Sequence, residues 1–410
     1  MPLLVQKFGG TSVASPDLIG NIADRIVETR QAGNDVVVVV SAMGETTDEL
    51  ISLAAAVNPD PPAREMDMLL TAGERISMAL TAMALARRGV DAVSFTGSQA
   101  GILTDNSHGA AKIREIKGDR IREGLAGGKV VIVAGFQGVD PESREITTLG
   151  RGGSDATAVA LAAALGADAC EIFTDVDGVF TADPRLVPDA RKLMDVSFDE
   201  MLELSAGGAG VLMPRAVEVG RRYDIPIHVR SSFESGDGTW VKAEAMEEAI
   251  IRGIAHDRSE AKVTVWGVPD QPGVAAALFE PMAEAGINVD MIVQNVSRQG
   301  NTDISFTVPK LGVARVAKAA QDASATLGAE GAEVDEDIGK VSLVGAGMKS
   351  HPGVAAKVFR AMAGTGINIE MISTSTIRIS CVVRGGDLDE AVRVLHDAFS
   401  PPMVEEEVGA

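Results

Sequence analysis

The chain has 410 residues, enough for two or three domains with hydrophobic cores, and its 46% hydrophobic and 23% charged residues are typical of a globular protein. Its formal net charge of −21 argues against nucleic acid or an anionic membrane surface as a partner, because so acidic a chain cannot broadly neutralise phosphate groups. An anionic substrate would therefore need a local cluster of cations or a bound metal.

The sequence indicates a cytoplasmic protein. The N-terminus lacks the charged start and apolar core of a signal peptide, and no apolar run reaches the roughly 20 residues that span a bilayer. The two cysteines, Cys170 and Cys381, stand in apolar settings and are expected to be buried thiols rather than a disulfide. The five scattered histidines have no zinc-site spacing, so no metal site made of protein ligands is expected.

Strands and helices are predicted to alternate from the start of the chain. Residues 3–7 (LLVQK) predict a strand, and Ser15 as N-cap with Pro16 at the first helical position predicts a helix. The valine run of 36–41 follows as a strand buried on both faces. The alternation continues to about residue 230, which predicts a mostly parallel open sheet sandwiched by helices. Further helices are predicted at 64–88, 111–126 and 153–166, and further strands at 92–95, 129–136 and 169–174.

The second part of the chain contains an internal repeat. Residues 270–292 match residues 350–372, and residues 262–268 resemble residues 340–346. Each copy reads strand, Pro-Gly turn, helix, Gly-Ile-Asn turn and strand, then a further strand and helix, with a period of about 80 residues. This order predicts two α+β domains of the ferredoxin-like βαββαβ type. The predicted divisions are a catalytic α/β domain at 1–233, a linker at 234–259, α+β domains at 260–335 and 336–400, and an acidic tail at 401–410.

The first motif that suggests chemistry is KFGGTS, at the end of the first predicted strand. Gly9 and Gly10 would let backbone amides approach phosphate oxygens. Lys7 would project into the crevice at the strand ends, where open α/β sheets bind ligands. On the motif alone, a glycine turn beside an exposed lysine remains the alternative.

The second motif is GRGGSD, at residues 150–155, before an alanine-rich helix. The free amides of that helix's first turn and the adjacent Arg151 would form a site for a carboxylate or phosphate. Ser154 or Asp155 is also expected to cap the helix, a role that does not exclude the first.

Polar residues also follow two other predicted strands. The loop of residues 173–185 carries Asp175, Asp183 and Arg185 and suits ribose and base contacts, with a plain Asp-Gly turn as the alternative. The hydroxyl residues after strand 36–41 suit hydrogen bonds to a substrate. Within the predicted helix 64–88, Glu74 is either a site residue or a solvated charge.

In this order and spacing, the motifs resemble those of aspartokinases in the amino-acid kinase family, of the single-activity bacterial type regulated by lysine and threonine. The repeat matches the paired ACT domains of such enzymes, so the resemblance covers nearly the whole chain. It implies transfer of the ATP γ-phosphoryl group to the β-carboxylate of L-aspartate, giving 4-phospho-L-aspartate, the first step of lysine, threonine and methionine biosynthesis. Mg²⁺ would be bound mainly through the phosphates. No general base is needed, because a carboxylate with a pKa near ~3.9 is already ionised at neutral pH.

The resemblance also implies roles for individual residues. Catalysis would fall to Lys7, Glu74 and Asp155. Nucleotide-binding residues would be Lys7, Phe8, Gly9, Gly10, Ser41, Ser154, Thr174, Asp175, Phe180, Asp183, Arg185 and Gly210. Substrate-binding residues would be Glu45, Thr46, Thr47, Asp48, Glu49, Glu74, Arg151, Gly152, Gly153 and Ser154.

The paired ACT domains imply lysine and threonine as effectors and assembly of copies of the chain. The assembly would be a homo-oligomer, or an α/β complex whose regulatory subunit starts near Met246. Effector contacts would be Asn288, Val289, Asp290, Gln294, Asn368 and Ile369.

Two positions depart from the family pattern. Gly210 stands where the family usually has a lysine that contacts nucleotide, and Thr376 stands where an acidic residue is common. Two alternatives remain open: another member of the same family that acts on glutamate, N-acetylglutamate or UMP, or an amino-acid sensor with weakened catalysis.

Overall fold

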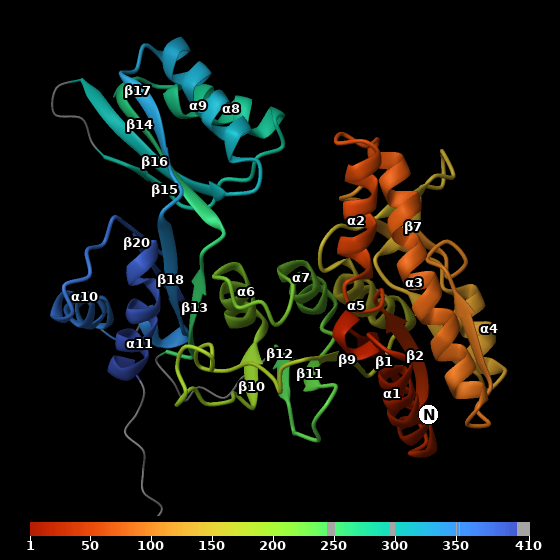
Figure 1. The fold of residues 1–410 in the computed structure, drawn as a ribbon. Helices are drawn as coiled ribbons and strands as arrows, with labels where there is room; N and C mark the ends of the chain where they lie inside the picture. The colour runs from red at the N-terminus through yellow and green to blue at the C-terminus, as the bar shows by residue number, and fades with distance from the viewer. Residues whose placement is uncertain (244–250, 296–299, 350, 352, 400–410) are drawn as a thin grey trace, which may run out of the picture. The chain divides into compact units, whose positions relative to one another are not determined.

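The computed structural model describes residues 1–243, 251–295, 300–349, 351 and 353–399, which form two compact units (Figure 1). The first unit comprises residues 1–179, 192–205 and the described residues from 210 to 243. The second comprises residues 180–191, 206–209 and the described residues from 251 on. The predicted acidic tail and Met246 lie outside the described residues.

An eight-stranded sheet forms the centre of the first unit, in the order β10-β12-β11-β9-β1-β2-β6-β3. Every neighbouring pair is parallel except β11 and β12, so the predicted mostly parallel sheet is confirmed. The strands are β1 (Leu3–Phe8), β2 (Asp35–Val40), β3 (Ala92–Phe95), β6 (Val130–Ala134), β9 (Ala169–Thr174), β10 (Asp195–Ser197), β11 (Ile227–Ser231) and β12 (Thr239–Lys242).

Helices cover both faces of this sheet. On one face α1 and α3 bury a core with Phe8, Val38 and Phe173, while α5 packs on β1, β2 and β9 and against α7. Helix α1 begins as predicted, because the Ser15 hydroxyl accepts the Leu18 N–H at 3.2 Å. The helices are α1 (Pro16–Gln31), α2 (Thr46–Val57), α3 (Ala63–Ala86), α4 (Asp119–Ala126), α5 (Gly153–Leu165), α6 (Phe198–Ala206) and α7 (Pro214–Tyr223), with a 3-10 turn at Gly10–Val13.

A small second sheet in the first unit was not predicted. It has the order β5-β4-β7-β8, from β4 (Ile102–Thr104), β5 (Ile113–Ile116), β7 (Gln137–Val139) and β8 (Ile146–Thr148). The helix predicted over 111–126 is therefore wrong in its first half. Ile113 and Ile116 have helical spacing, but they belong to a strand whose pairing with β4 is shifted by an irregularity. The helix starts only after Gly118, which has a positive φ of 67°.

The second unit contains the two repeats, each with a four-stranded antiparallel sheet. The first repeat has the predicted βαββαβ order, β14 (Glu260–Pro269), α8 (Val274–Glu284), β15 (Ile292–Gln294), β16 (Asn301–Pro309), α9 (Val313–Leu327) and β17 (Gly331–Asp335). The second has β18 (Ile338–Val344), α10 (Val354–Gly364), β19 (Met371–Thr374), β20 (Arg378–Arg384) and α11 (Leu388–Phe399), with 3-10 turns at Ala346–Lys349 and Gly385–Asp387.

The edge strand of the second repeat comes from an unexpected place. β13 (Gly253–Asp257) precedes the first repeat in the chain, yet it pairs with β18, as β17 pairs with β14. The segment 234–259 therefore contains β12 of the large sheet and β13 of the second repeat, and is more than the linker that its polar sequence predicted. In chain order, the first repeat therefore lies between β13 and the rest of the second repeat.

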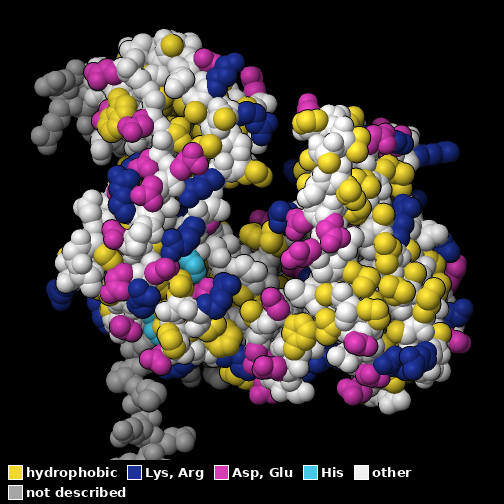
Figure 2. Space-filling model, viewed as in Figure 1, with side chains coloured by type: hydrophobic (Ala, Val, Ile, Leu, Met, Phe, Trp, Pro, Cys, Tyr) yellow, Lys and Arg dark blue, Asp and Glu magenta, His cyan; other side chains and the backbone are white. Residues whose placement is uncertain are grey.

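Both cysteines are buried free thiols, as expected. Among the described residues, α3 is the one helix long and apolar enough to cross a membrane by length and composition. It packs on α1 and the sheet and buries Asp67 and Glu74, so it is placed as a core helix of its unit. Figure 2 shows hydrophobic side chains on the face that carries α2 and α3, where Leu53 and Met83 are among the exposed residues.

Candidate active site

The carboxyl ends of three parallel strands meet at one edge of the large sheet. Phe8 of β1 lies opposite Val40 of β2 and Phe173 of β9. Neighbouring residues in a strand face opposite sides of the sheet. The Phe8 ring stacks on that of Phe173, with centroids 4.8 Å apart, on the α1 side, and Lys7 therefore faces α5.

Lys7 forms a buried ion pair with Asp155 from the first turn of α5. Lys7 Nζ lies 2.6 Å from Asp155 Oδ1, and the two side chains are only 11% and 10% exposed. A Cβ at Gly9 would lie 3.5 Å from Lys7 Nζ, so the missing side chain leaves the ammonium approachable from that side. Lys7, predicted as the cation for a phosphate group, and Asp155, predicted to orient it, are thus in direct contact.

One of the two glycine amides predicted to bind phosphate, that of Gly9, already donates a hydrogen bond within the protein. The Gly9 N–H donates to the Phe173 carbonyl at 3.2 Å, so that amide is already engaged at the sheet edge. A Cβ at Gly10 would stand 3.1 Å from the carbonyl oxygens of Ala42 and Gly44. The close approach of the loop after β2 is therefore one reason why residue 10 is glycine.

The predicted N-cap of α5 is wrong. The cap residue is Gly152, in a left-handed conformation with φ of 69°, and it makes no side-chain cap bond. A Cβ there would overlap the Met213 side chain, at 1.9 Å from its Cγ. Because glycine makes the turn, Ser154 and Asp155 enter the first turn as buried residues, and Asp155 can pair with Lys7 instead.

Glu74 reaches the same edge from α3. Its Oε1 accepts the Ala42 N–H at 3.1 Å, while Ser77 Oγ donates to the Ser41 carbonyl at 2.6 Å, so α3 holds the loop after β2. Glu74 Oε2 is buried without a hydrogen-bond partner among the described residues. Burial raises the pKa of Glu74 to about 7, against the smaller lowering effect of backbone N–H groups. Glu74 is thus no solvated charge, and it keeps one oxygen for a donor.

Three of the other predicted substrate residues line an open pocket at the start of α2. The pocket has a volume of about 300 Å³ and is lined by Glu45, Thr46 and Glu49, with Gly73 from α3. Arg151 is exposed, and its Nη2 lies 3.6 Å from Asp48 Oδ1. The first turn of α2 and the loop that carries Arg151 are therefore adjacent, as the aspartate-site prediction requires.

The predicted nucleotide residues divide between the units. Thr174 ends β9, and its hydroxyl donates to Asp175 at 3.0 Å. Gly210 is exposed, and a Cβ placed there would have no described residue within 4 Å. Phe180, Asp183 and Arg185 belong to the second unit, and their part in a nucleotide site stays a prediction.

The predicted effector residues lie at equivalent places in the two repeats. Asn288, Val289 and Asp290 lie between α8 and β15, and Asn368 and Ile369 lie between α10 and β19. Asp290 Oδ2 is 2.7 Å from the buried ammonium of Lys340.

Four polar residues around the substrate loop were missed from the sequence. Asp67, His108 and Thr148 form one hydrogen-bonded cluster, and Arg215 donates to the carbonyls of Leu149 and Ala111. The one available signal was Asp67 itself, an acidic residue flanked by Met66 and Met68 in α3.

Comparisons with known proteins bear on this geometry. Residues 2–231 match the amino acid kinase family, and residues 263–323 and 341–399 match an ACT domain family. The chain is 58% identical to an aspartokinase of Mycolicibacterium smegmatis over 97% of this chain and 96% of that one. It is 57% identical to an aspartokinase of Corynebacterium glutamicum, with the same coverage. The chain belongs to the aspartokinases of the amino acid kinase family.

Solved structures agree with this assignment. The aspartokinase fold here superposes on Escherichia coli aspartokinase III in complex with aspartate and ADP (R-state), with a TM-score of 0.84 at 27% identity over 97% of this chain and 99% of the other. Against the same protein in complex with lysine and aspartate (T-state), the TM-score is 0.75. The predicted family, fold class and ATP-dependent kinase activity are confirmed.

Proposed function

We propose that this aspartokinase transfers the ATP γ-phosphoryl group to the β-carboxylate of L-aspartate at the sheet edge that carries Lys7. The observation behind this proposal is the buried Lys7–Asp155 pair beside the N-terminus of α5. A helix N-terminus and a cation there suit a phosphoryl group in transfer, which needs charge compensation and in-line positioning. Aspartate complexed with E. coli aspartokinase III supports the choice of acceptor.

Each site residue has a distinct role in this proposal. Lys7 offsets the charge of the transferring group, and Asp155 orients its ammonium. Arg151 binds a carboxylate of aspartate, and Glu74 accepts a hydrogen bond from its α-ammonium through the unpartnered Oε2. No residue acts as general base, since the nucleophile is already ionised.

Mg²⁺ is expected to be held mainly by phosphate oxygens and water. Among the described residues, no group of three or more His, Cys, Asp and Glu side chains could hold a metal ion, and Mg²⁺ commonly relies on substrate phosphates. The ion would supply further neutralisation of phosphate charge.

The test of the acceptor is hydroxamate trapping of the acyl phosphate with ATP and one candidate acid at a time. L-Aspartate should give product, whereas L-glutamate and N-acetylglutamate should give none above the blank. Equal or greater product with either of the other acids would refute the proposed acceptor. No product with any acid would instead support the sensor alternative.

We further propose that lysine and threonine regulate the enzyme through the paired repeats, at Asn288 to Asp290, Gln294, Asn368 and Ile369. The lysine complex of E. coli aspartokinase III supports lysine as an effector. Assembly of copies through these domains and a cytoplasmic location complete the proposal. Initial rates measured with and without both amino acids test the regulation, and identical rates would rule it out.

A further inference from the structure

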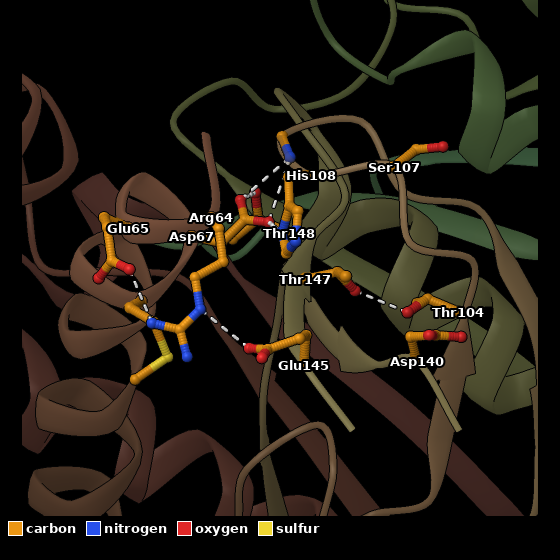
Figure 3. Close-up of polar contacts among 12 residues, drawn as sticks. Arg64, Glu65, Asp67, Thr104, Ser107, His108, Asp140, Glu145, Thr147 and Thr148 are labelled. Carbon is orange, nitrogen blue, oxygen red and sulfur yellow. Dashed lines mark hydrogen bonds and ion pairs between the residues drawn. The ribbon is translucent and has the colours of Figure 1, made fainter. Parts of the chain in front are cut away.

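We propose that Asp67 is a positioning residue for the loop that carries Arg151, an inference that rests on the proposed role of Arg151 in aspartate binding. Asp67 lies in α3 and is fully buried, at 0% exposure. Among the described residues, its hydrogen bonds go neither to the ends of β1, β2 and β9 nor to the pocket lining described above. Its hydrogen bonds instead go to Thr148, three residues before Arg151, and to His108 and Gly109 in the turn between β4 and β5 (Figure 3).

Three groups donate hydrogen bonds to the Asp67 carboxylate. Thr148 Oγ1, at the end of β8, lies 2.5 Å from Oδ1. The Gly109 N–H reaches the same oxygen at 3.0 Å, and His108 Nδ1 lies 2.6 Å from Oδ2. One carboxylate on α3 thus joins β8 to the turn between β4 and β5.

A buried carboxylate is costly unless donors compensate it, and hydrogen bonds to charged groups are about twice as strong as neutral ones. With three donors, Asp67 meets that condition. The loss of the carboxylate would leave the Gly109 amide and the Thr148 hydroxyl without an acceptor inside the protein. These hydrogen bonds therefore keep α3, the end of β8 and the β4–β5 turn, together called the Asp67 junction, in one arrangement.

The junction lies directly before the substrate loop. The Thr148 carbonyl accepts the Ala111 N–H at 2.9 Å, and the Leu149 N–H donates to the Phe136 carbonyl at 2.9 Å. Arg215 closes the other side by donating to the Leu149 carbonyl at 3.2 Å. A Cβ at Gly150 would lie 3.0 Å from the Gly109 carbonyl, so these backbones touch. The chain is fixed up to the residue before Arg151.

Asp67 also links the two sides of the aspartate site. Glu74 lies about two turns further along α3, on the same face of the helix. Glu74 holds the loop after β2 through Ala42, while Asp67 holds the loop after β8 through Thr148. Asp67 therefore sets the distance between Glu74, proposed for the α-ammonium, and Arg151, proposed for a carboxylate.

The decisive experiment is steady-state kinetics of the full chain with Asp67→Ala and Thr148→Val. Both variants should raise KM for aspartate by about ten- to a hundredfold, because a displaced loop loses orientation of its ligand. kcat and KM for ATP should change by less than about threefold. Thr148→Ser keeps the hydroxyl and should restore KM to within about twofold of the parent.

The controls separate positioning from stability. Thr81→Val removes another buried side-chain hydrogen bond of α3, to the Ser77 carbonyl, far from the Arg151 loop, and should leave KM unchanged. Arg151→Ala should raise KM for aspartate, and adding Asp67→Ala to it should raise KM by no more than about twofold further. If Asp67 acted on its own, the two effects would multiply.

Failures of the two proposals are distinguishable. If Arg151→Ala leaves KM for aspartate unchanged, the proposed role of Arg151 fails, and the inference about Asp67 fails with it. If Arg151→Ala raises KM while Asp67→Ala and Thr148→Val lower only the melting temperature, Asp67 is structural and the positioning proposal alone is overturned.

Discussion

Each unit buries a lysine beside carboxylate groups, but the ratio of negative to positive charge differs between the two centres. In the first unit, which matches the amino acid kinase family and is called the kinase unit below, Lys7 Nζ pairs with one carboxylate, that of Asp155. The second unit, which holds the two ACT repeats, is called the ACT unit. In the ACT unit, Lys340 Nζ lies 2.5 Å from Glu260 and 2.7 Å from Asp290, and its side chain is 1% exposed. Burial alone would lower the pKa of Lys340, but the two carboxylates overcome that effect and raise the pKa above its usual value.

The ACT lysines also form a reciprocal arrangement. Lys262 and Lys340 are the third residues of equivalent strands, β14 and β18, and Asp290 and Glu370 follow equivalent Gly-Ile-Asn turns. Lys340 pairs with Asp290 of the first repeat, and Lys262 pairs with Glu370 of the second. The two repeats are thus joined by matched ion pairs.

The comparison separates two uses of a buried cation. Lys340 is surrounded by more negative charge than it carries, so it has little left to offer an anionic ligand and serves to hold the repeats together. Within the described part of the chain, Lys7 pairs with one carboxylate and has a glycine beside it, so it can take an additional negative group. The following changes test this distinction, from the largest expected effect to the smallest.

Replacing Lys7 should have the largest effect on catalysis. Lys7→Ala removes the cation proposed for the phosphoryl group, and kcat should fall by about a hundredfold or more while the protein remains folded. The measurement is kcat by coupled ADP release, with circular dichroism as the check on folding. The control is Lys340→Met, which should keep kcat within about threefold in the absence of effectors. Near-normal turnover in Lys7→Ala would remove Lys7 from the mechanism.

Replacing Lys340 should mainly affect stability. Lys340→Met leaves Glu260 and Asp290 side by side without their ammonium, and breaking a buried ion pair typically costs about 3–5 kcal/mol. The lower end is expected here, because the Asp290 side chain is 40% exposed and water screens part of its charge. Denaturant unfolding followed in the ACT unit should show an earlier transition. Adding Glu260→Gln and Asp290→Asn should restore part of the loss, and no recovery would contradict the charge argument.

The sequence was informative where local turn chemistry and spacing determine the structure. The start of α1, the strand that carries Lys7 and the helix after GRGGSD all follow from residues close together in the chain. The Asp67 junction could not be predicted, because its partners lie 41 and 81 residues away and no local pattern connects them. The strand β13 was missed for a related reason, since five residues that pair with β18 carry no sign of their partner.

Glu74 offers a test through pH, because it is a buried carboxylate of the kinase unit with an unpartnered oxygen and a raised pKa. Its pKa is raised to about 7, so the folded protein binds a proton there that the unfolded chain releases nearer the usual pKa of 4.5. The free energy of unfolding should therefore fall as pH rises from about 4.5 to 7, at up to 1.4 kcal/mol per pH unit from this group.

The variant Glu74→Gln should remove that slope. Urea unfolding at several pH values is the measurement, with L-aspartate added in a second series. If the α-ammonium of aspartate pairs with Glu74, bound ligand should flatten the slope of the parent as well. A slope that is the same in parent and variant would show that other groups cause it.

The smallest expected effect comes from adding a cation to the kinase unit at Gly210. No described residue lies within 4 Å of a Cβ placed there, so Gly210→Lys should be accommodated without loss of stability. The family resemblance predicts a lysine that contacts nucleotide at this position, so the variant should lower KM for ATP by a few-fold, about 1 kcal/mol at most. Gly210→Gln is the matched neutral control, since it adds similar bulk without charge. An equal change in KM for ATP in both variants would mean that side-chain bulk causes the effect. Nucleotide binding would then need no positive charge at residue 210.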